Sequence, residues 1–345
     1  MRVIVLNNMA PFTWGGAEEL AHHLVQNLRA AGVEAEGLRI PFSWEPAELL
    51  IEQILMCQSF RITDTDRVIC LKFPAYYAQH DNKFFWLLHQ YRQAYDLWDA
   101  GQSNIPATPR GETIRRVIHE ADNQAFKSAR HIYCNSSTTA DRLKRYNGFD
   151  SDVLMPPLND PELFSGGADD GYLLAPGRVN STKRQFMLVE AMRHLPQSTR
   201  LVVAGPPDSP EDADDLRRRV EAAGLQDRVK LDLRFLSREE LARYANNARA
   251  VIYIPFDEDS VGYVTMEAFQ AGKPVLTTAD SGGLLQIVRD RETGAVVAPN
   301  PEALAEGMTR LMSDSSQAAR MGKAGRELWL SLGIDWSSTL SKLMA

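Results

Sequence analysis

The stretch FDEDSVGYVTMEAFQAGKPVL, residues Phe256–Leu276, reads as an acidic turn, an apolar helix and the beginning of a strand. Two acids in it, Asp259 and Glu267, are eight positions apart, separated by a turn that contains Gly262. This order predicts one carboxylate in a loop, backbone N–H groups at a helix N-terminus, and a second carboxylate inside the helix. Such N–H groups bind phosphates, and carboxylates accept strong hydrogen bonds from hydroxyls. The stretch therefore indicates a nucleotide-sugar site.

Outward from this stretch, short apolar runs alternate with amphipathic helical segments, which is typical of parallel sheets covered by helices. The strands expected in the first half are Val3–Leu6, Glu36–Ile40, Val68–Leu71, Phe84–Leu88, Ile132–Cys134 and Val153–Met155. Those expected in the second half are Tyr172–Ala175, Leu201–Ala204, Val229–Leu231, Val251–Ile254, Pro274–Thr277 and Ala295–Val297. The helices expected between these strands lie near Ala17–Ala31, Ala47–Cys57, Thr113–Ser128, Thr138–Tyr146, Lys183–His194, Pro210–Ala223, Arg238–Asn247 and Val264–Ala271. Ser237-Arg238-Glu239-Glu240 is a capping box, which predicts a helix start at that point. The sequence thus predicts an α/β protein with two doubly wound halves.

Two breaks divide these halves. The prolines of Pro156–Asp160 interrupt regular structure, and the Gly/Asp-rich run Ser165–Gly171 is typical of a hinge linker. We therefore expect a first Rossmann-like domain over 1–165 and a second over 166–330. An amphipathic helix is expected near Ser337–Met344, within a C-terminal segment 331–345.

Composition restricts the class of protein. The chain has 345 residues, 44% of them hydrophobic, and a net charge of −7, without the basic excess of a nucleic-acid binder. The cysteines are odd in number (Cys57, Cys70 and Cys134), which indicates buried thiols in a reducing compartment. The apolar opening is too short for a signal peptide, and no apolar run reaches the ~18 residues of a membrane helix. These features favour a cytoplasmic protein. The basic segment Arg110–Arg145 reads as two solvated helix faces, with peripheral contact to membrane headgroups or an anionic acceptor as the alternative.

The spacing of Asp259 and Glu267 resembles the E-x7-E signature of retaining glycosyltransferase family 4, within the group 1 glycosyl transferases, with Asp in the first acidic position. The resemblance implies the GT-B architecture, in which two Rossmann-like domains face a central cleft and the C-terminal helix returns to the first domain. It implies transfer of a sugar from a nucleoside diphosphate-sugar to a hydroxyl of a glycan, lipid or small-molecule acceptor. The shorter Asp259 reaches about 1.5 Å less than Glu, one C–C bond.

The resemblance also implies roles for individual residues. Arg178 and Lys183 look like the pair that neutralises the donor diphosphate, since fixed cations stabilise a leaving phosphate without a metal. Asp259 and Glu267 would contact the hydroxyls of the donor sugar and the ribose. The backbone of Gly262, Tyr263, Val264 and Thr265 would hold the β-phosphate, Gly15 and Gly16 would let N–H groups approach the donor, and Phe235 and Leu236 flank the expected base site. His89, at a strand end, is the candidate for the reaction centre.

Other interpretations stay open. Gly15 and Gly16 also suit a plain tight turn, His89 a structural residue, and Lys72 either an acceptor contact or a surface lysine. The aromatic residues favour a core, with sugar stacking as the alternative: Tyr76, Tyr77, Tyr91, Tyr95 and Trp98.

Rival functions also stay open. Asp257-Glu258-Asp259 mimics a D-x-D metal motif, but that pattern recurs at Asp64-Thr65-Asp66 and Asp212-Ala213-Asp214. We therefore expect neither metal nor cofactor. A nucleotide-sugar epimerase using His89, His119 and Glu120, and an inactive nucleotide-sugar binding module, are the alternatives to a transferase.

Overall fold

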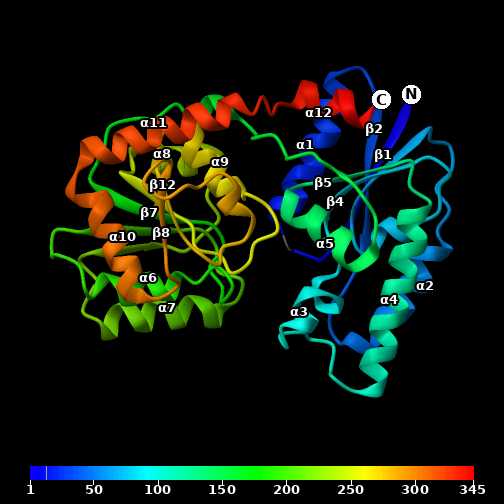
Figure 1. Cartoon of the computed structure of the whole chain (residues 1–345), viewed down its shortest axis with the longest axis horizontal. Helices are drawn as coiled ribbons and strands as arrows, with labels where there is room; N and C mark the ends of the chain where they lie inside the picture. The colour runs from blue at the N-terminus through cyan, green and yellow to red at the C-terminus, as the bar shows by residue number, and fades with distance from the viewer. Residues whose placement is uncertain (13) are drawn as a thin grey trace. The chain divides into compact units, whose positions relative to one another are not determined.

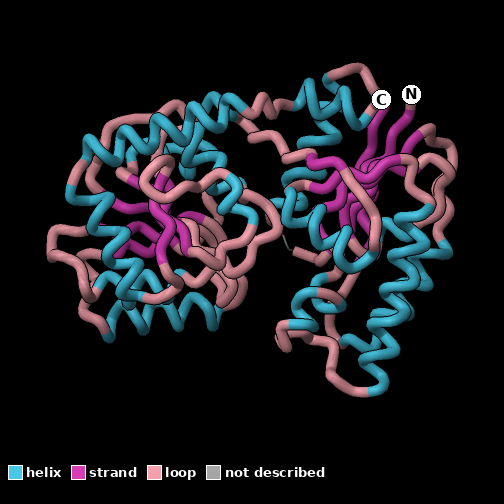
Figure 2. The backbone as a smooth tube through the Cα atoms, in the orientation of Figure 1, coloured by secondary structure: helices cyan, strands magenta, loops and turns pink. Residues whose placement is uncertain are grey.

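The computed structural model of the chain describes residues 1–12 and 14–345, so that Thr13 lies outside the described residues. It divides into two compact units, Met1–Pro157 with Ile334–Ala345, and Leu158–Gly333. In each unit a parallel sheet is flanked by helices, as Figures 1 and 2 show.

The sheet of the first unit has the strand order β2-β1-β3-β4-β5-β6. Its strands are β1 (Arg2–Met9), β2 (Glu34–Pro41), β3 (Arg67–Lys72), β4 (Lys83–His89), β5 (His131–Cys134) and β6 (Asp152–Val153). All pairings between them are parallel. The order reverses between β1 and β3, so the loop after β1 lies at a topological switch point, where ligands of such sheets bind.

The helices of the first unit are α1 (Gly16–Ala30), α2 (Leu50–Ser59), α3 (Asp96–Asp99), α4 (Pro109–Lys127), α5 (Ser137–Asn147) and α12 (Trp336–Leu343). Alternate strand residues face opposite sides. Val5 and Ile69 pack with residues of α1 and α12, whereas Leu6 and Cys70 pack with residues of α2, α4 and α5. The three cysteines are free and buried, as the sequence predicts.

The last helix, α12, belongs to the first unit by packing. Leu340 and Leu343 lie in the core with Val5, and Arg67 of β3 donates hydrogen bonds to the carbonyls of Leu343 at 2.6 Å and Ala345 at 3.0 Å.

The sheet of the second unit has the order β12-β11-β10-β7-β8-β9. Its strands are β7 (Tyr172–Pro176), β8 (Arg200–Ala204), β9 (Val229–Asp232), β10 (Ala250–Ile252), β11 (Val275–Thr278) and β12 (Gly294–Val297). Read from β9, this is the strand order of dinucleotide-binding Rossmann folds, with its switch point between β7 and β10.

The helices of the second unit are α6 (Gln185–Met192), α7 (Pro210–Ala222), α8 (Arg238–Asn247), α9 (Tyr263–Gln270), α10 (Pro301–Ser313) and α11 (Ser315–Ser331). Helices α6, α7 and α10 pack against one another, and α8, α9 and α11 form the other group (Figure 1). Because α6 and α9 follow the neighbouring strands β7 and β10 but belong to different groups, the ends of these two strands are the point at which ligands of such sheets bind.

The α/β class, the two parallel sheets and the capping box of Ser237 with Glu240 at the start of α8 are confirmed. The sequence analysis did not identify α10 and α11. The division between the units falls before Leu158, whereas the sequence places it after residue 165. Residues 158–165 join the second unit because Phe164 is fully buried and the carbonyl of Asn159 accepts a hydrogen bond from Arg238.

Candidate functional site

The β7/β10 switch point brings together loops from three strand ends. Phe256 N–H donates to the Thr182 carbonyl at 2.9 Å, which ties the loop after β10 to the loop after β7. Glu258 pairs with Gly282, which ties it to the loop after β11. The residues singled out by the sequence, Lys183 and Asp259, lie in this set of joined loops.

Arg184 connects the same loops through its buried guanidinium. It is 8% exposed and forms a bidentate ion pair with Asp280, with nitrogen–oxygen distances of 2.8 and 2.9 Å. It also donates to the carbonyls of Ile254 and Pro255 and to the Thr278 hydroxyl. These contacts satisfy the hydrogen-bond donors of a nearly buried guanidinium, so Arg184 is a positioning residue for the loops that it connects.

Lys183 is a cation of the same loops with two side-chain partners. Its Nζ forms an ion pair with Glu258 and donates to the Tyr253 hydroxyl at 2.9 Å. Burial lowers the pKa of Lys183, but Tyr253 and Glu258 outweigh burial and hold that pKa above its ordinary value. Burial raises the pKa of Tyr253 to about 12. Lys183 is therefore a fixed positive charge at neutral pH.

Asp259 and the N-terminus of α9 lie beside this cation. Asp259 is 8% exposed. Gly262, the N-cap of α9, has φ +73°, and an added Cβ would lie 2.6 Å from a ring carbon of Tyr253. Only glycine fits there, because any other residue would be strained at this positive φ and its Cβ would clash with the Tyr253 ring. The helix start at Tyr263 is thereby placed next to the Tyr253–Lys183 pair.

Glu267 lies on the first turns of α9 and is 4% exposed. It forms an ion pair with Arg238, the first residue of α8, and Arg238 in turn donates to the Asn159 carbonyl at 2.9 Å. Asp160 lies 3.5 Å from Arg238 Nε. A buried carboxylate of this kind needs a cation, since leaving either partner alone costs several kcal/mol.

Arg178 is more exposed than Lys183. Its Nη1 lies 3.0 and 3.1 Å from the two carboxylate oxygens of Asp208, which follows β8, and Asn180 also donates to Asp208 at 2.8 Å. The guanidinium is thus held at the mouth of the strand ends by an acid that the sequence analysis did not single out. Further along the same edge, Phe235 is 66% exposed in the loop before α8, and Leu236 is half-buried.

In the first unit, the candidate residues also follow strand ends. Gly15 is the N-cap of α1, its N–H donates to Glu18 at 3.1 Å, and Gly16 begins the helix. His89 is the last residue of β4 and pairs in register with Lys72, the last residue of β3. The Nδ1 of His89 donates to the Gln90 carbonyl at 2.6 Å, so the neutral ring has its acceptor nitrogen at Nε2.

The aromatic stretch of the first unit is core, as favoured: Tyr76, Tyr77, Tyr91 and Tyr95 are buried. Sequence reasoning missed the acidic partners Glu258 and Asp208, and also Arg184 and Arg238. Glu258 and Arg238 stand in stretches already recognised, the acidic turn and the capping box, so a search for charges next to the motif would have found them.

Among residues 1–12 and 14–345, no group of His, Cys, Asp or Glu side chains has the arrangement of a metal site. In the same described part of the chain, no helix is long and apolar enough to cross a membrane.

Comparison with known proteins places this geometry in a class. Residues 164–328, nearly the whole second unit, match the family described as glycosyl transferases group 1. The fold is that of sucrose-phosphate synthase from Thermosynechococcus elongatus, with TM-score 0.77, 20% identity and coverage of 99% of this chain and 97% of that chain. It is also that of HepE from Anabaena, solved with UDP and glucose, with TM-score 0.74, 16% identity and coverage of 100% and 98%. The chain has the GT-B fold, and its match to the group 1 glycosyl transferases lies in the second unit.

Curated relatives agree with this class. The D-inositol 3-phosphate glycosyltransferase of Xylanimonas cellulosilytica is 31% identical over 198 residues, which cover 54% of this chain and 47% of the relative. That of Mycobacteroides abscessus is 29% identical over 260 residues, covering 68% and 54%. The chain spans about half the length of these curated relatives.

Proposed function

We propose that the protein is a retaining glycosyltransferase of family 4, which transfers a sugar from a nucleoside diphosphate-sugar to an acceptor hydroxyl without a metal. The observation that carries the proposal is the grouping of Lys183, Asp259 and the N-terminus of α9 at the β7/β10 switch point. A fixed cation and helix N–H groups suit a diphosphate, and the neighbouring carboxylate suits sugar hydroxyls.

The reaction makes one demand on this site. A bond forms between the acceptor oxygen and the anomeric carbon, and the bond from that carbon to the phosphate oxygen breaks. The leaving nucleoside diphosphate takes the electron pair, and on the retaining route it also takes the acceptor's proton on the same face. Lys183 and Arg178 stabilise the negative charge that develops on the phosphate. These cations supply the charge that a divalent ion supplies elsewhere, so we expect activity in the presence of a chelator.

The remaining roles follow the geometry of the second unit. Glu267, buried on α9, is placed to accept hydrogen bonds from the ribose, for which Arg238 must give up part of its pairing. The loop around Phe235 is the candidate base site, because its exposed ring lies at the same edge of the sheet. His89 in the first unit stays the candidate contact to the reacting sugar.

Thermal unfolding of the full chain with EDTA present tests the proposal. The panel contains UDP, GDP, ADP, CMP and their sugar conjugates, and UDP-glucose comes first because the HepE neighbour was solved with UDP. A ligand at about 100 times its dissociation constant adds ~2.7 kcal/mol to stability. One nucleoside diphosphate is expected to raise the melting temperature, and no rise with any of them would overturn the proposal.

Product analysis separates the rival functions. D-inositol 3-phosphate is the first acceptor to test, given the names of the relatives. Transfer to an acceptor with retained anomeric configuration supports the proposal. Conversion of the donor sugar without any acceptor would instead show an epimerase. Nucleotide binding without hydrolysis or transfer would show a binding module, and activity that EDTA abolishes and manganese restores would refute the metal-free site.

A further inference from the structure

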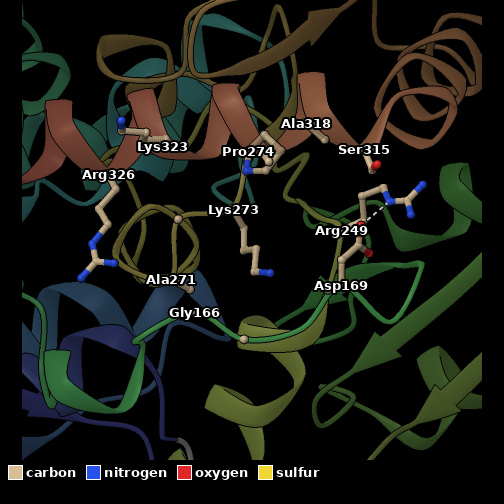
Figure 3. A pocket seen from close by; sticks show the side chains of 14 residues that line it. Gly166, Asp169, Arg249, Ala271, Lys273, Pro274, Ser315, Ala318, Lys323 and Arg326 are labelled. Atoms are coloured by element: carbon tan, nitrogen blue, oxygen red, sulfur yellow. Dashed lines mark hydrogen bonds and ion pairs between the residues drawn. The ribbon is translucent and has the colours of Figure 1, made fainter.

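The second unit has a cavity of about 310 Å³ at the opposite edge of its sheet from the β7/β10 strand ends. It lies where β10 and β11 begin, beside the glycine-rich segment that precedes β7 and against α11 (Figure 3). A volume of this size is at the lower end of small-molecule sites. Its wall is formed by the following residues: Gly166, Gly167, Asp169, Ala248, Arg249, Ala271, Gly272, Lys273, Pro274, Ser315, Ala318, Ala319, Lys323 and Arg326.

Close backbone approaches shape the cavity. A Cβ added to Gly322 of α11 would lie 2.0 Å from the Gly272 carbonyl oxygen, so this helix touches the turn before β11 only because residue 322 is glycine. The contact brings the side chains of α11 next to Lys273. Alanines at 318 and 319 then leave open the volume that larger side chains would fill.

The cavity is strongly basic in a chain whose net charge is −7. Arg249, Lys273, Lys323 and Arg326 line it, and Asp169 is the only carboxylate among the described residues of the lining. That carboxylate is already occupied, since its Oδ2 lies 2.7 Å from Arg249 Nε. Lys323 has an exposed partner outside the lining, Glu327, at 3.7 Å.

Lys273 is the decisive residue. Its side chain extends into the cavity (Figure 3), it is 8% exposed, and over the described residues its ammonium group has no hydrogen bond or ion pair. Burial lowers the pKa of Lys273, and Asp169 and Asp170 act against that shift without touching the ammonium group. The ammonium nitrogen is not among the fully buried side-chain nitrogens of the described residues, so the charge faces the cavity and is reached by solvent there. An anion that enters the cavity can therefore pair with it directly.

We propose that this cavity binds a small phosphate-bearing ligand, whose phosphate is held by Lys273. Lys273 supplies a point charge that faces the cavity, and the half-buried Arg326 adds a second cation to the wall, directed away from Lys273 (Figure 3). The Ser315 hydroxyl, at the start of α11, adds a donor to the wall. The site is separate from the proposed donor site and does not depend on the transferase proposal.

Alanine-methyl NMR of the full chain tests the proposal, because Ala318 and Ala319 carry methyl probes in the wall. The probes are inorganic phosphate and glycerol 3-phosphate, and sodium chloride at matched ionic strength is the control. We expect saturating shifts of these two methyl signals with both phosphates and none with chloride. Absence of shifts, or shifts that grow equally with chloride and never saturate, would overturn the proposal.

Two matched variants locate the binding. Lys273→Met keeps the length of the side chain and removes its charge, and it should raise the dissociation constant for inorganic phosphate about tenfold or more. Lys230→Met changes the net charge equally but lies outside the cavity, and it should leave the affinity unchanged. Lys273→Met should unfold at the same temperature as the wild-type chain or higher, since it removes a cation that is partly desolvated by burial and has no ion pair. Equal phosphate affinity in all three proteins would refute the site.

A vesicle experiment distinguishes the source of the phosphate. Co-sedimentation uses phosphatidylcholine vesicles with and without phosphatidic acid, whose headgroup is a phosphomonoester. Binding that requires phosphatidic acid and is lost in Lys273→Met assigns the site to a lipid headgroup. Saturating methyl shifts with glycerol 3-phosphate but no vesicle binding assign it to a free small molecule.

Discussion

The second sheet has a carboxyl edge, where its strands end, and an amino edge, where they begin, and the two edges hold cations in opposite ways. At the carboxyl edge, Lys183 is paired with Glu258, and Arg238 is paired with Glu267. At the amino edge, Lys273 is the less exposed residue, at 8%, but within the described residues its ammonium group has neither a hydrogen bond nor an ion pair. The same sheet therefore carries one set of charges that is neutralised internally and one that is not.

This difference bears on how each edge binds a ligand. In the proposed donor site, a diphosphate would have to take Lys183 from Glu258, so we expect only ligands that replace the lost contact to bind well. An anion at the amino edge supplies the first partner of Lys273 and gives up no existing ion pair there. The first unit offers a third case: Asp122 is fully buried and receives hydrogen bonds from the neutral hydroxyls of Tyr76, Tyr77 and Tyr95.

The largest expected effect is at the carboxyl edge. Lys183→Met should lower the rate of sugar transfer by ~10²–10³, because it removes a charge that stabilises the leaving phosphate. The measurement is turnover with the donor identified by thermal unfolding. Lys183→Met combined with Glu258→Gln controls for the acid left unpaired, and it should be as slow as the single variant. Wild-type turnover in either protein would refute the assignment of Lys183.

The next largest effect is the pH dependence of stability caused by Asp122, a buried carboxyl group whose hydrogen-bond partners are tyrosines and not cations. Burial raises its pKa to about 6 from 3.8, against the lowering effect of the tyrosine hydrogen bonds. Between pH 3.8 and about pH 6, Asp122 keeps its proton in the folded chain but has released it in the unfolded chain. The stability that the protonated group contributes is therefore complete below the pKa of the unfolded chain and is lost as the pH rises through the pKa of the folded chain. The loss amounts to about 3 kcal/mol, from ~1.36 kcal/mol per unit of pKa shift.

Urea unfolding of the wild type and Asp122→Asn at about pH 4 and about pH 7 measures this loss. The variant should be less stable at both, since its amide cannot accept from all three tyrosines. The deficit should shrink as the pH rises, because only the wild type loses stability in that interval. A deficit that stays constant or grows with pH would contradict the raised pKa.

The smallest effect tests the exchange at the carboxyl edge directly. Glu258→Gln weakens the internal partner of Lys183 and should tighten the binding of the nucleoside diphosphate about fivefold, since such partly exposed pairs are worth ~1 kcal/mol. Titration calorimetry measures the affinity. Glu240→Gln is the matched control, because it changes the same charge in the ion pair with Arg234. Unchanged or weaker binding in Glu258→Gln would show that Lys183 and Glu258 do not compete with the ligand.

Local patterns predicted what local physics decides. The strands, the capping box of Ser237 and the helix start at Gly262 depend on neighbouring residues, and each lies within three residues of its expected place. The expected division after residue 165 missed the true one because Phe164 is held by distant side chains, including Arg238, whose guanidinium lies 5.0 Å from the ring centre.

The ion-pair partners could not be predicted from local sequence patterns. Asp208 is thirty positions from Arg178, and their pairing follows from β8 lying next to β7 in the sheet. The basic cavity is harder still, because Gly166, Arg249, Lys273 and Arg326 come from separate segments with no motif between them. Only the folded arrangement shows that Lys273 is buried.

The packing of α12 has a consequence for synthesis on the ribosome. The second unit is one continuous segment, Leu158–Gly333, whereas the first unit includes Ile334–Ala345. Domains fold as units while the chain emerges. We therefore expect part of the sheet surface of the first unit to stay uncovered until Leu340 and Leu343 have been synthesised. The second unit has been synthesised completely before that point. Although its sheet is translated first, the N-terminal unit is the last to finish folding.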